Sequence, residues 1–87
     1  MAEEQMVAQV PAGSIFEHYK GKKYKVYGVA RHSETLELMI HYQSLYNCST
    51  YGDHAFWVRP LEMFLGTIVI DGVEVPRFRR VSQLNLV

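Results

Sequence analysis

The chain has 87 residues, 48% of them hydrophobic and 21% charged, and its nine Lys and Arg balance nine Asp and Glu. This hydrophobic content excludes a wholly disordered chain, and a chain this short folds as one small domain with a thin core. The balanced charge argues against a dedicated nucleic-acid-binding protein, and no apolar run is long enough to cross a membrane.

The first thirteen residues, MAEEQMVAQVPAG, are predicted to form a flexible leader that closes with Pro11 and Gly13. A helical turn over residues 3–10 would be too short to persist alone. The stretch is acidic where a signal peptide would be basic, and the single cysteine, Cys48, needs no oxidising compartment. We therefore expect a cytoplasmic protein whose residues 14–87 form one small β-barrel-like domain.

Three strands are predicted in the first half of this domain, at residues 15–19, 24–32 and 36–44. A turn around Gly21 joins the first two, and Gly28 indicates a bend inside the second. The third strand alternates between two faces, with Leu36, Leu38, Ile40 and Tyr42 on one and Glu37, His41 and Gln43 on the other. This period of two is typical of a strand with two distinct environments.

Residues 45–54, LYNCSTYGDH, are predicted to be a loop because Asn, Ser, Thr, Gly and Asp are gathered there. A strand follows at 55–60, with Phe56 and Val58 on one face and Trp57 and Arg59 on the other. Pro60 ends this strand or confines it to an edge.

The last elements are a short helical turn at 61–65 and the segment TIVIDGVEV. Its two β-rich arms are joined by Asp71 and Gly72, the pair that favours a type I′ hairpin. A short strand at 78–81 brings the number of predicted strands to five or six. They predict an all-β fold, either a strongly bent antiparallel sheet or a partly open barrel.

The segment ARHSETLE, residues 30–37, places Arg31, His32, Ser33 and Glu34 side by side between two predicted strands. Ser and Thr hydroxyls bond to local backbone groups, so the segment suits a hairpin loop of about three to five residues. The alternative is a reactive cluster. A one-residue change of register would turn Arg31 to the opposite face, so the orientation of Arg31 and His32 stays open.

No catalytic, metal or cofactor motif is recognised. The four histidines do not pair with one another or with Cys48 at the spacing of a closed zinc site. His32 and Ser33 are strand neighbours that would point to opposite faces, which argues against a nucleophile and base pair. The sequence therefore favours a protein that is not an enzyme.

The best constellation is Trp57 with Arg59, an aromatic platform beside a guanidinium. With Arg31 it predicts a non-catalytic binding module for a protein segment or, less favoured, a nucleic acid. The alternative is a small enzyme or binder of an anionic small molecule that uses Arg31, His32, Glu34 and Arg59. In the plainest interpretation, Trp57 caps the core and Arg59 pairs with a glutamate.

Two other interactions are predicted from the same sequence. Nucleic-acid binding needs the basic clusters at 20–25 and 77–80 to meet on one surface. A homodimer needs an edge strand such as 55–58 to pair across two copies.

The segments HYKGKKYKVYGVARHSETLE, WVRPLEMF and DGVEVPRF, in this order and spacing, closely resemble the family of domains of unknown function numbered 1653. The resemblance spans about residues 18–78. It implies a compact, mostly β, SH3-like domain and supplies no established activity, ligand or catalytic residue. Two departures are a longer loop at 45–54 and Leu36, where family members often have glycine.

Overall fold

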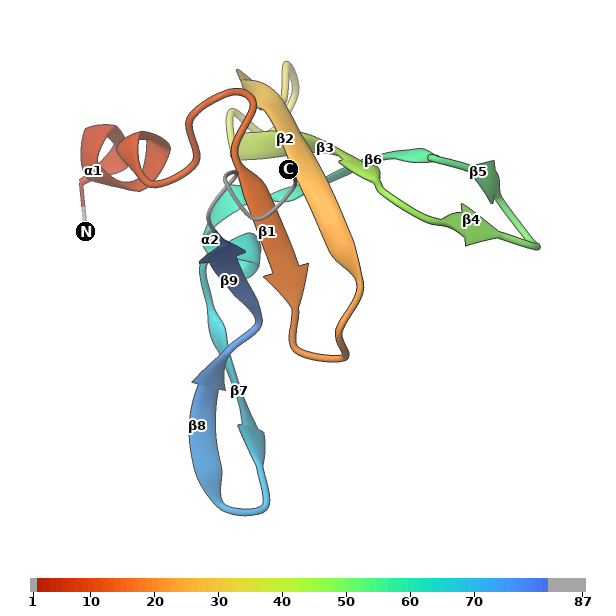
Figure 1. Cartoon of the computed structure of the whole chain (residues 1–87). Coiled ribbons are helices and arrows are strands. Elements are labelled where there is room, and N and C mark those ends of the chain that lie inside the picture. Colours follow the sequence, from red (N-terminus) through yellow and green to blue (C-terminus); the bar gives the residue numbers. More distant parts are fainter. Residues whose placement is uncertain (1, 82–87) are drawn as a thin grey trace.

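A five-stranded antiparallel sheet lies at the centre of the computed structural model, which describes residues 2–81 (Figure 1). Its strands follow the order β6-β3-β2-β1-β9. They are β1 (Ile15–His18), β2 (Lys23–Arg31), β3 (Leu38–Ser44), β6 (Phe56–Pro60) and β9 (Phe78–Val81). The two outer strands, β6 and β9, do not pair with each other, so the sheet is open and not closed into a barrel.

Two small two-stranded ladders and two short helices complete the described residues. The ladders are β4 (Asn47–Cys48) with β5 (Gly52–Asp53), and β7 (Thr67–Ile70) with β8 (Val73–Pro76). The helices are α1 (Glu3–Ala8) and α2 (Leu61–Phe64). Figure 1 shows both ladders extending away from the central sheet. The mostly β, antiparallel prediction is confirmed, whereas the SH3-like topology stays a prediction.

The core lies between the inner face of the sheet and α2. This single helical turn buries Leu61 and Phe64 completely, because both point toward the sheet. Phe64 stacks on Phe78 of β9 with ring centroids 4.0 Å apart, and it meets Phe16 of β1 edge to face at 5.2 Å. A thin core gains much of its apolar burial from such large rings. The aromatic cluster therefore joins α2 to β1 and β9, at one end of the sheet.

Leu36 lies outside the strand that was predicted to contain it. β3 begins at Leu38, and Leu36 has φ 65° and an exposed side chain. A positive φ of this kind is one that glycine adopts without strain, and it belongs to a turn rather than a strand. Leu36 therefore occupies a turn position of the kind that glycine adopts most easily.

The predicted loop at 45–54 contains a ladder, since Asn47 pairs with Asp53 and Cys48 with Gly52. The segment predicted as a flexible leader carries α1, and its Val10 is buried in the core at 2% exposure. Flexibility of residues 1–13 stays a prediction, but Val10 belongs to the core of the domain.

Two predictions from single residues are confirmed. The register of β2 and β3 shifts between Val26 and Gly28, so a bulge bends β2 at the predicted glycine. Asp71 and Gly72 have φ values of 51° and 78° between β7 and β8, as a type I′ turn requires. β6 lies at an edge of the sheet, and dimerisation through that edge stays a prediction.

Among the described residues, no helix combines the length and apolar character needed to span a membrane.

Candidate functional site

An aromatic pocket of about 270 Å³ opens beside the core, near the edge strand β6. Four tyrosines, one tryptophan, one cysteine and one arginine line it: Tyr24, Tyr42, Tyr46, Tyr51, Trp57, Cys48 and Arg59. We call this the aromatic pocket. None of these lining residues is a carboxylate, so the pocket is aromatic with one permanent positive charge.

The strand register explains why these side chains meet. In the pairing of β3 with β6, Tyr42 lies opposite Trp57 and Ile40 lies opposite Arg59. Paired residues of antiparallel strands share a face, so Trp57 and Arg59 point to the same side as the buried Ile40 and Tyr42. The β4–β5 ladder then folds Tyr51 onto Trp57, with ring centroids 5.0 Å apart.

Arg59 is held in position by neutral groups. Its Nε donates to the Tyr42 hydroxyl at 3.2 Å, and its Cζ lies 5.5 Å from the centre of the Phe78 ring. None of the ion pairs between described residues involves Arg59. The predicted pairing with a glutamate is thus absent from the described part of the chain, and the guanidinium is oriented without being neutralised.

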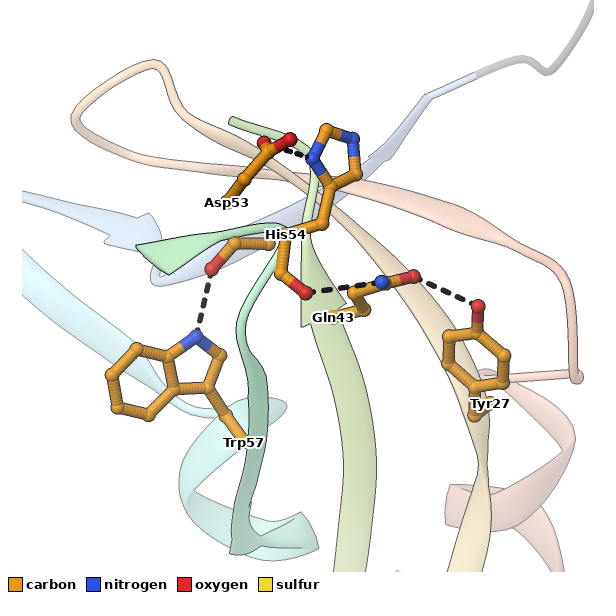
Figure 2. A network of polar contacts seen from close by, with 6 residues as sticks. Tyr27, Gln43, Asp53, His54 and Trp57 are labelled. Carbon is orange, nitrogen blue, oxygen red and sulfur yellow. Dashed lines mark hydrogen bonds and ion pairs between the residues drawn. The ribbon is translucent and has the colours of Figure 1, made fainter. Parts of the chain in front are cut away.

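Trp57 is attached to the core by a hydrogen bond. Its Nε1–H donates to the Ser44 hydroxyl at 2.7 Å, and Ser44 is fully buried (Figure 2). The indole is half-buried and packs against the core cluster. The predicted capping of the core by Trp57 and its role in a pocket wall are therefore combined in one side chain.

Two tyrosines of the pocket share a hydrogen bond. The Tyr24 and Tyr46 hydroxyls are 2.7 Å apart, and the Lys22 Nζ lies 4.9 Å from the centre of the Tyr46 ring. Burial, followed by the bond to Tyr46, raises the pKa of the Tyr24 hydroxyl above its ordinary value of 10.0. The Tyr24 hydroxyl therefore stays protonated at neutral pH.

Cys48 contributes the one thiol of the pocket. The backbone N–H groups of Tyr51 and Thr50 lie against its sulfur, and they lower the pKa of the thiol from its ordinary 9.0. Lys22 acts in the same direction. The turn between β4 and β5 therefore favours negative charge at the sulfur.

His18 lies next to the aromatic pocket, where burial and the charge of Arg59 affect its pKa. Its ring is 6.5 Å from that of Tyr24 and 5.0 Å from that of Phe78. Burial, followed by the positive charges of Arg59, Lys20 and Arg77, lowers the pKa of His18. Three positively charged side chains thus lie close enough to act on the His18 ring.

The other predicted site residues lie elsewhere. Arg31 ends β2, whereas Tyr24 lies near its beginning, roughly 20 Å away along an extended strand. Arg31 donates to the carboxylate of Glu3 in α1 at 3.1 Å and to the Leu36 carbonyl at 2.8 Å. The structure therefore does not bring Arg31 to Trp57 and Arg59.

The segment ARHSETLE is closed by its own hydrogen bonds. The Nδ1 atom of His32 accepts from the backbone N–H groups of Glu34 at 3.1 Å and Thr35 at 3.3 Å. The N–H of His32 donates to the Glu37 carbonyl at 2.8 Å, across the turn. His32 and Glu34 thus serve the turn and do not line the aromatic pocket.

A larger cavity of about 400 Å³ lies between the end of β1 and the β7–β8 hairpin. Tyr19, Ile70, Val75 and Pro76 give it an apolar wall, and the ion pair of Glu17 with Arg79 neutralises two of its charges. The aromatic pocket differs from this cavity because its one charged side chain, Arg59, has no ion-pair partner among the described residues. Within residues 2–81, no three His, Cys, Asp or Glu side chains group as metal ligands.

A small open β domain with an aromatic, positively charged pocket is the class that these features define. The family model described as protein of unknown function DUF1653 matches residues 14–80, so the chain belongs to this family. The chain is also similar to a crystal structure of a DUF1653 protein from Bordetella bronchiseptica. The two share 30% identity at a TM-score of 0.70, over 84% of this chain and 90% of the other. No curated protein matches the sequence.

Proposed function

We propose that this protein is a non-catalytic binding module that holds an acidic segment of a partner protein in the aromatic pocket. One observation carries the proposal: Arg59 is fixed by Tyr42 and Phe78, faces no carboxylate among the described residues, and lies within a wall of aromatic rings. An oriented guanidinium recognises a carboxylate through two parallel hydrogen bonds.

The size of the pocket supports a side chain as the occupant. Its volume of about 270 Å³ is below the roughly 300–1,000 Å³ of sites for whole small molecules. A carboxylate on a short stem fits such a space, while Tyr51 and Trp57 contact the neighbouring part of the segment. Aromatic residues with one polar end are enriched at protein interfaces for this reason.

The test is an NMR titration of the ¹⁵N-labelled full chain with an acidic peptide, a basic peptide of the same length, and a short oligonucleotide. Trp57 is the chain's only tryptophan, so its indole N–H gives one resonance inside the pocket. We expect the acidic peptide to shift that resonance. No shift with the acidic peptide, or an equal shift with the basic one, would overturn the proposal. A shift with the oligonucleotide alone would assign the pocket to nucleic acid instead.

Two variants and one control make the test specific. Arg59→Gln removes the charge and should weaken binding about tenfold or more, as loss of a charged hydrogen bond does. Arg59→Lys keeps the charge without the planar guanidinium, so its affinity should lie between those of the unaltered protein and Arg59→Gln. Arg80→Gln changes an exposed arginine of β9 and should bind like the unaltered protein. Equal affinity of Arg59→Gln and Arg80→Gln would contradict the assignment of Arg59.

A further inference from the structure

The outer face of the sheet, opposite the aromatic pocket, carries an exposed cluster of rings. Tyr27, His41 and Phe56 lie on β2, β3 and β6, and each pair of ring centroids is 5.4–5.5 Å apart. Phe56 is 57% exposed and Tyr27 41% exposed. We call this cluster the outer platform. Large apolar groups left uncovered in this way are uncommon on a protein without a partner for them.

The bulge in β2 explains how Tyr27 joins this face. The strand partners shift between Val26 and Gly28, so Tyr27 lies in the bulge without a pairing partner on β3. A bulge redirects a side chain relative to the regular alternation. Here it allows the ring to approach His41 and Phe56.

Hydrogen bonds fix the platform in position. The Tyr27 hydroxyl donates to Oε1 of Gln43 at 2.8 Å, and Nε2 of Gln43 donates to the His54 carbonyl at 3.0 Å (Figure 2). The Lys25 Nζ lies 5.4 Å from the centre of the Tyr27 ring. A ring that is already ordered loses little side-chain entropy when a ligand stacks on it.

The charge of this face is positive. Glu17 of β1 lies opposite Lys23 of β2 on one side and opposite Arg79 of β9 on the other. Lys25 of β2 lies on the same face, opposite Gln43 of β3, which in turn lies opposite Phe56 of β6. Among the residues that the strand pairings place on this face, Glu17 is the one carboxylate, and it pairs with Arg79. Lys23 and Lys25 remain uncompensated. Of the two basic clusters of the sequence, the first therefore supplies Lys23 and Lys25 to the surface that carries the rings, and the second supplies Arg79, which is paired with Glu17.

We propose that the outer platform binds single-stranded nucleic acid, with bases stacked on Tyr27, His41 and Phe56 and phosphates near Lys23 and Lys25. Stacking on aromatic rings beside a basic track is how single strands are held without sequence preference. Rings this close together offer room for one or two bases, so binding is modest and strongly dependent on salt. A duplex should bind more weakly because its bases already stack on each other.

This inference does not rest on the proposed role of the aromatic pocket. Trp57 and Arg59 point to the inner side of β6, whereas Phe56 and Val58 point outward from the same strand. Variants of the two faces therefore separate the two functions.

The experiment measures fluorescence anisotropy of a labelled oligothymidine of about ten nucleotides with the full chain, at about 50 and about 200 mM salt. We expect binding at the lower salt and marked weakening at the higher one. We expect the corresponding duplex to bind more weakly than the single strand. No binding at the lower salt, or equal binding of the duplex, would overturn the inference.

Variants locate the binding on the face. Phe56→Ala and Lys25→Gln should each weaken binding about five- to tenfold, and Lys25→Gln should also reduce the salt dependence. The matched controls are Met63→Ala, which changes an exposed apolar residue of α2, and Arg80→Gln, which removes a charge that the register places on the face of the buried Phe16. Both should change affinity less than twofold. Circular dichroism verifies that each variant is folded. Unchanged affinity of both Phe56→Ala and Lys25→Gln, or a greater loss with Arg80→Gln, would overturn the inference.

Discussion

The indole of Trp57 is both a wall of the aromatic pocket and a donor to the buried Ser44 hydroxyl. A polar atom buried as deeply as the Ser44 hydroxyl depends on this partner, since water cannot replace it without an opening of the core. The pocket and the stability of the domain are therefore connected through one side chain.

We predict that Trp57→Phe lowers the free energy of unfolding by about 1–3 kcal/mol, because the Ser44 hydroxyl is left buried without its donor. The double variant Trp57→Phe/Ser44→Ala should recover part of this loss, since neither polar group then remains. Urea unfolding followed by far-ultraviolet circular dichroism measures both. A midpoint for Trp57→Phe equal to that of the unaltered protein, or no recovery in the double variant, would contradict the prediction.

His18 gives a pH dependence to the same region. Its pKa is lowered below the ordinary 6.5 by burial and then by Arg59, so the folded protein binds this proton less readily than the unfolded chain does. The stability contributed by neutral His18 is complete above pH 6.5 and is lost as the pH falls below that value. Acidification therefore weakens the domain at the edge of its pocket.

We predict that Arg59→Gln raises the pKa of His18 and makes its contribution to the loss of stability below pH 6.5 smaller. NMR titration of the His18 ring protons measures the pKa directly. Arg79→Gln is the control, because Arg79 pairs with Glu17 and is not among the charges that act on His18. A His18 titration that is the same in both variants would exclude Arg59 as a cause.

At the scale of elements, the β7–β8 hairpin has the least support. It forms a sheet of its own, extends from the domain in Figure 1, and leaves Val69 and Val73 largely exposed. A two-stranded hairpin is marginally stable in water by itself. We therefore expect its amides to exchange with solvent faster than those of β2 and β3.

We predict that Gly72→Ala accelerates amide exchange in the hairpin about fivefold, equivalent to about 1 kcal/mol, because alanine is strained at φ 78°. Gly28→Ala is the matched control. Gly28 does not have a positive φ, and a side chain there meets nothing within 4 Å. Hydrogen exchange measured by mass spectrometry compares the two variants. Equal exchange rates of the hairpin amides in both would contradict the predicted strain at residue 72.

The elements differ in how far their sequence determines them. Asp71 and Gly72 define their hairpin alone, because the turn conformation requires residues of this kind. Ile40 and Tyr42 define the core face of β3 by alternation. The β4–β5 ladder has only two residues in each strand, too few for any period to be visible.

At the scale of the molecule, the candidate site could be predicted only where its residues share a strand. Trp57 and Arg59 are two residues apart on β6, so their common face follows from the sequence. Arg31 depends on strand register and on the approach of Glu3 from α1, which involve long-range contacts. Cys48 and Tyr51 reach the pocket because the β4–β5 ladder folds back on itself, and no local sequence pattern predicts that ladder.

Val10 connects the N-terminal segment to the rest of the molecule. It is buried with Phe16, Val26 and Ile40 in one core cluster, and Met6 packs against the same cluster. Val10 follows the end of α1 and lies in no helix or strand, so no periodic pattern marks it for burial. The core thus includes a residue of the segment predicted as a leader, and the domain boundary at residue 14 stays a prediction.

We predict that Val10→Ala lowers the free energy of unfolding by about 1–2 kcal/mol, because it removes two buried carbons and leaves a cavity. Val7→Ala, in the same segment but 38% exposed, is the control and should have little effect. Chemical unfolding of both variants tests this. Equal midpoints for the two would show that residues 1–13 lie outside the cooperative unit.

The position of Cys48 also makes the aromatic pocket accessible to direct observation. It is the chain's single cysteine, and its thiol is activated by the turn that carries it. A thiol-reactive fluorophore therefore attaches at one place, on the wall of the pocket beside Tyr51. The emission of such a reporter would change as a segment enters or leaves, so arrival and departure can be timed on an otherwise unaltered chain.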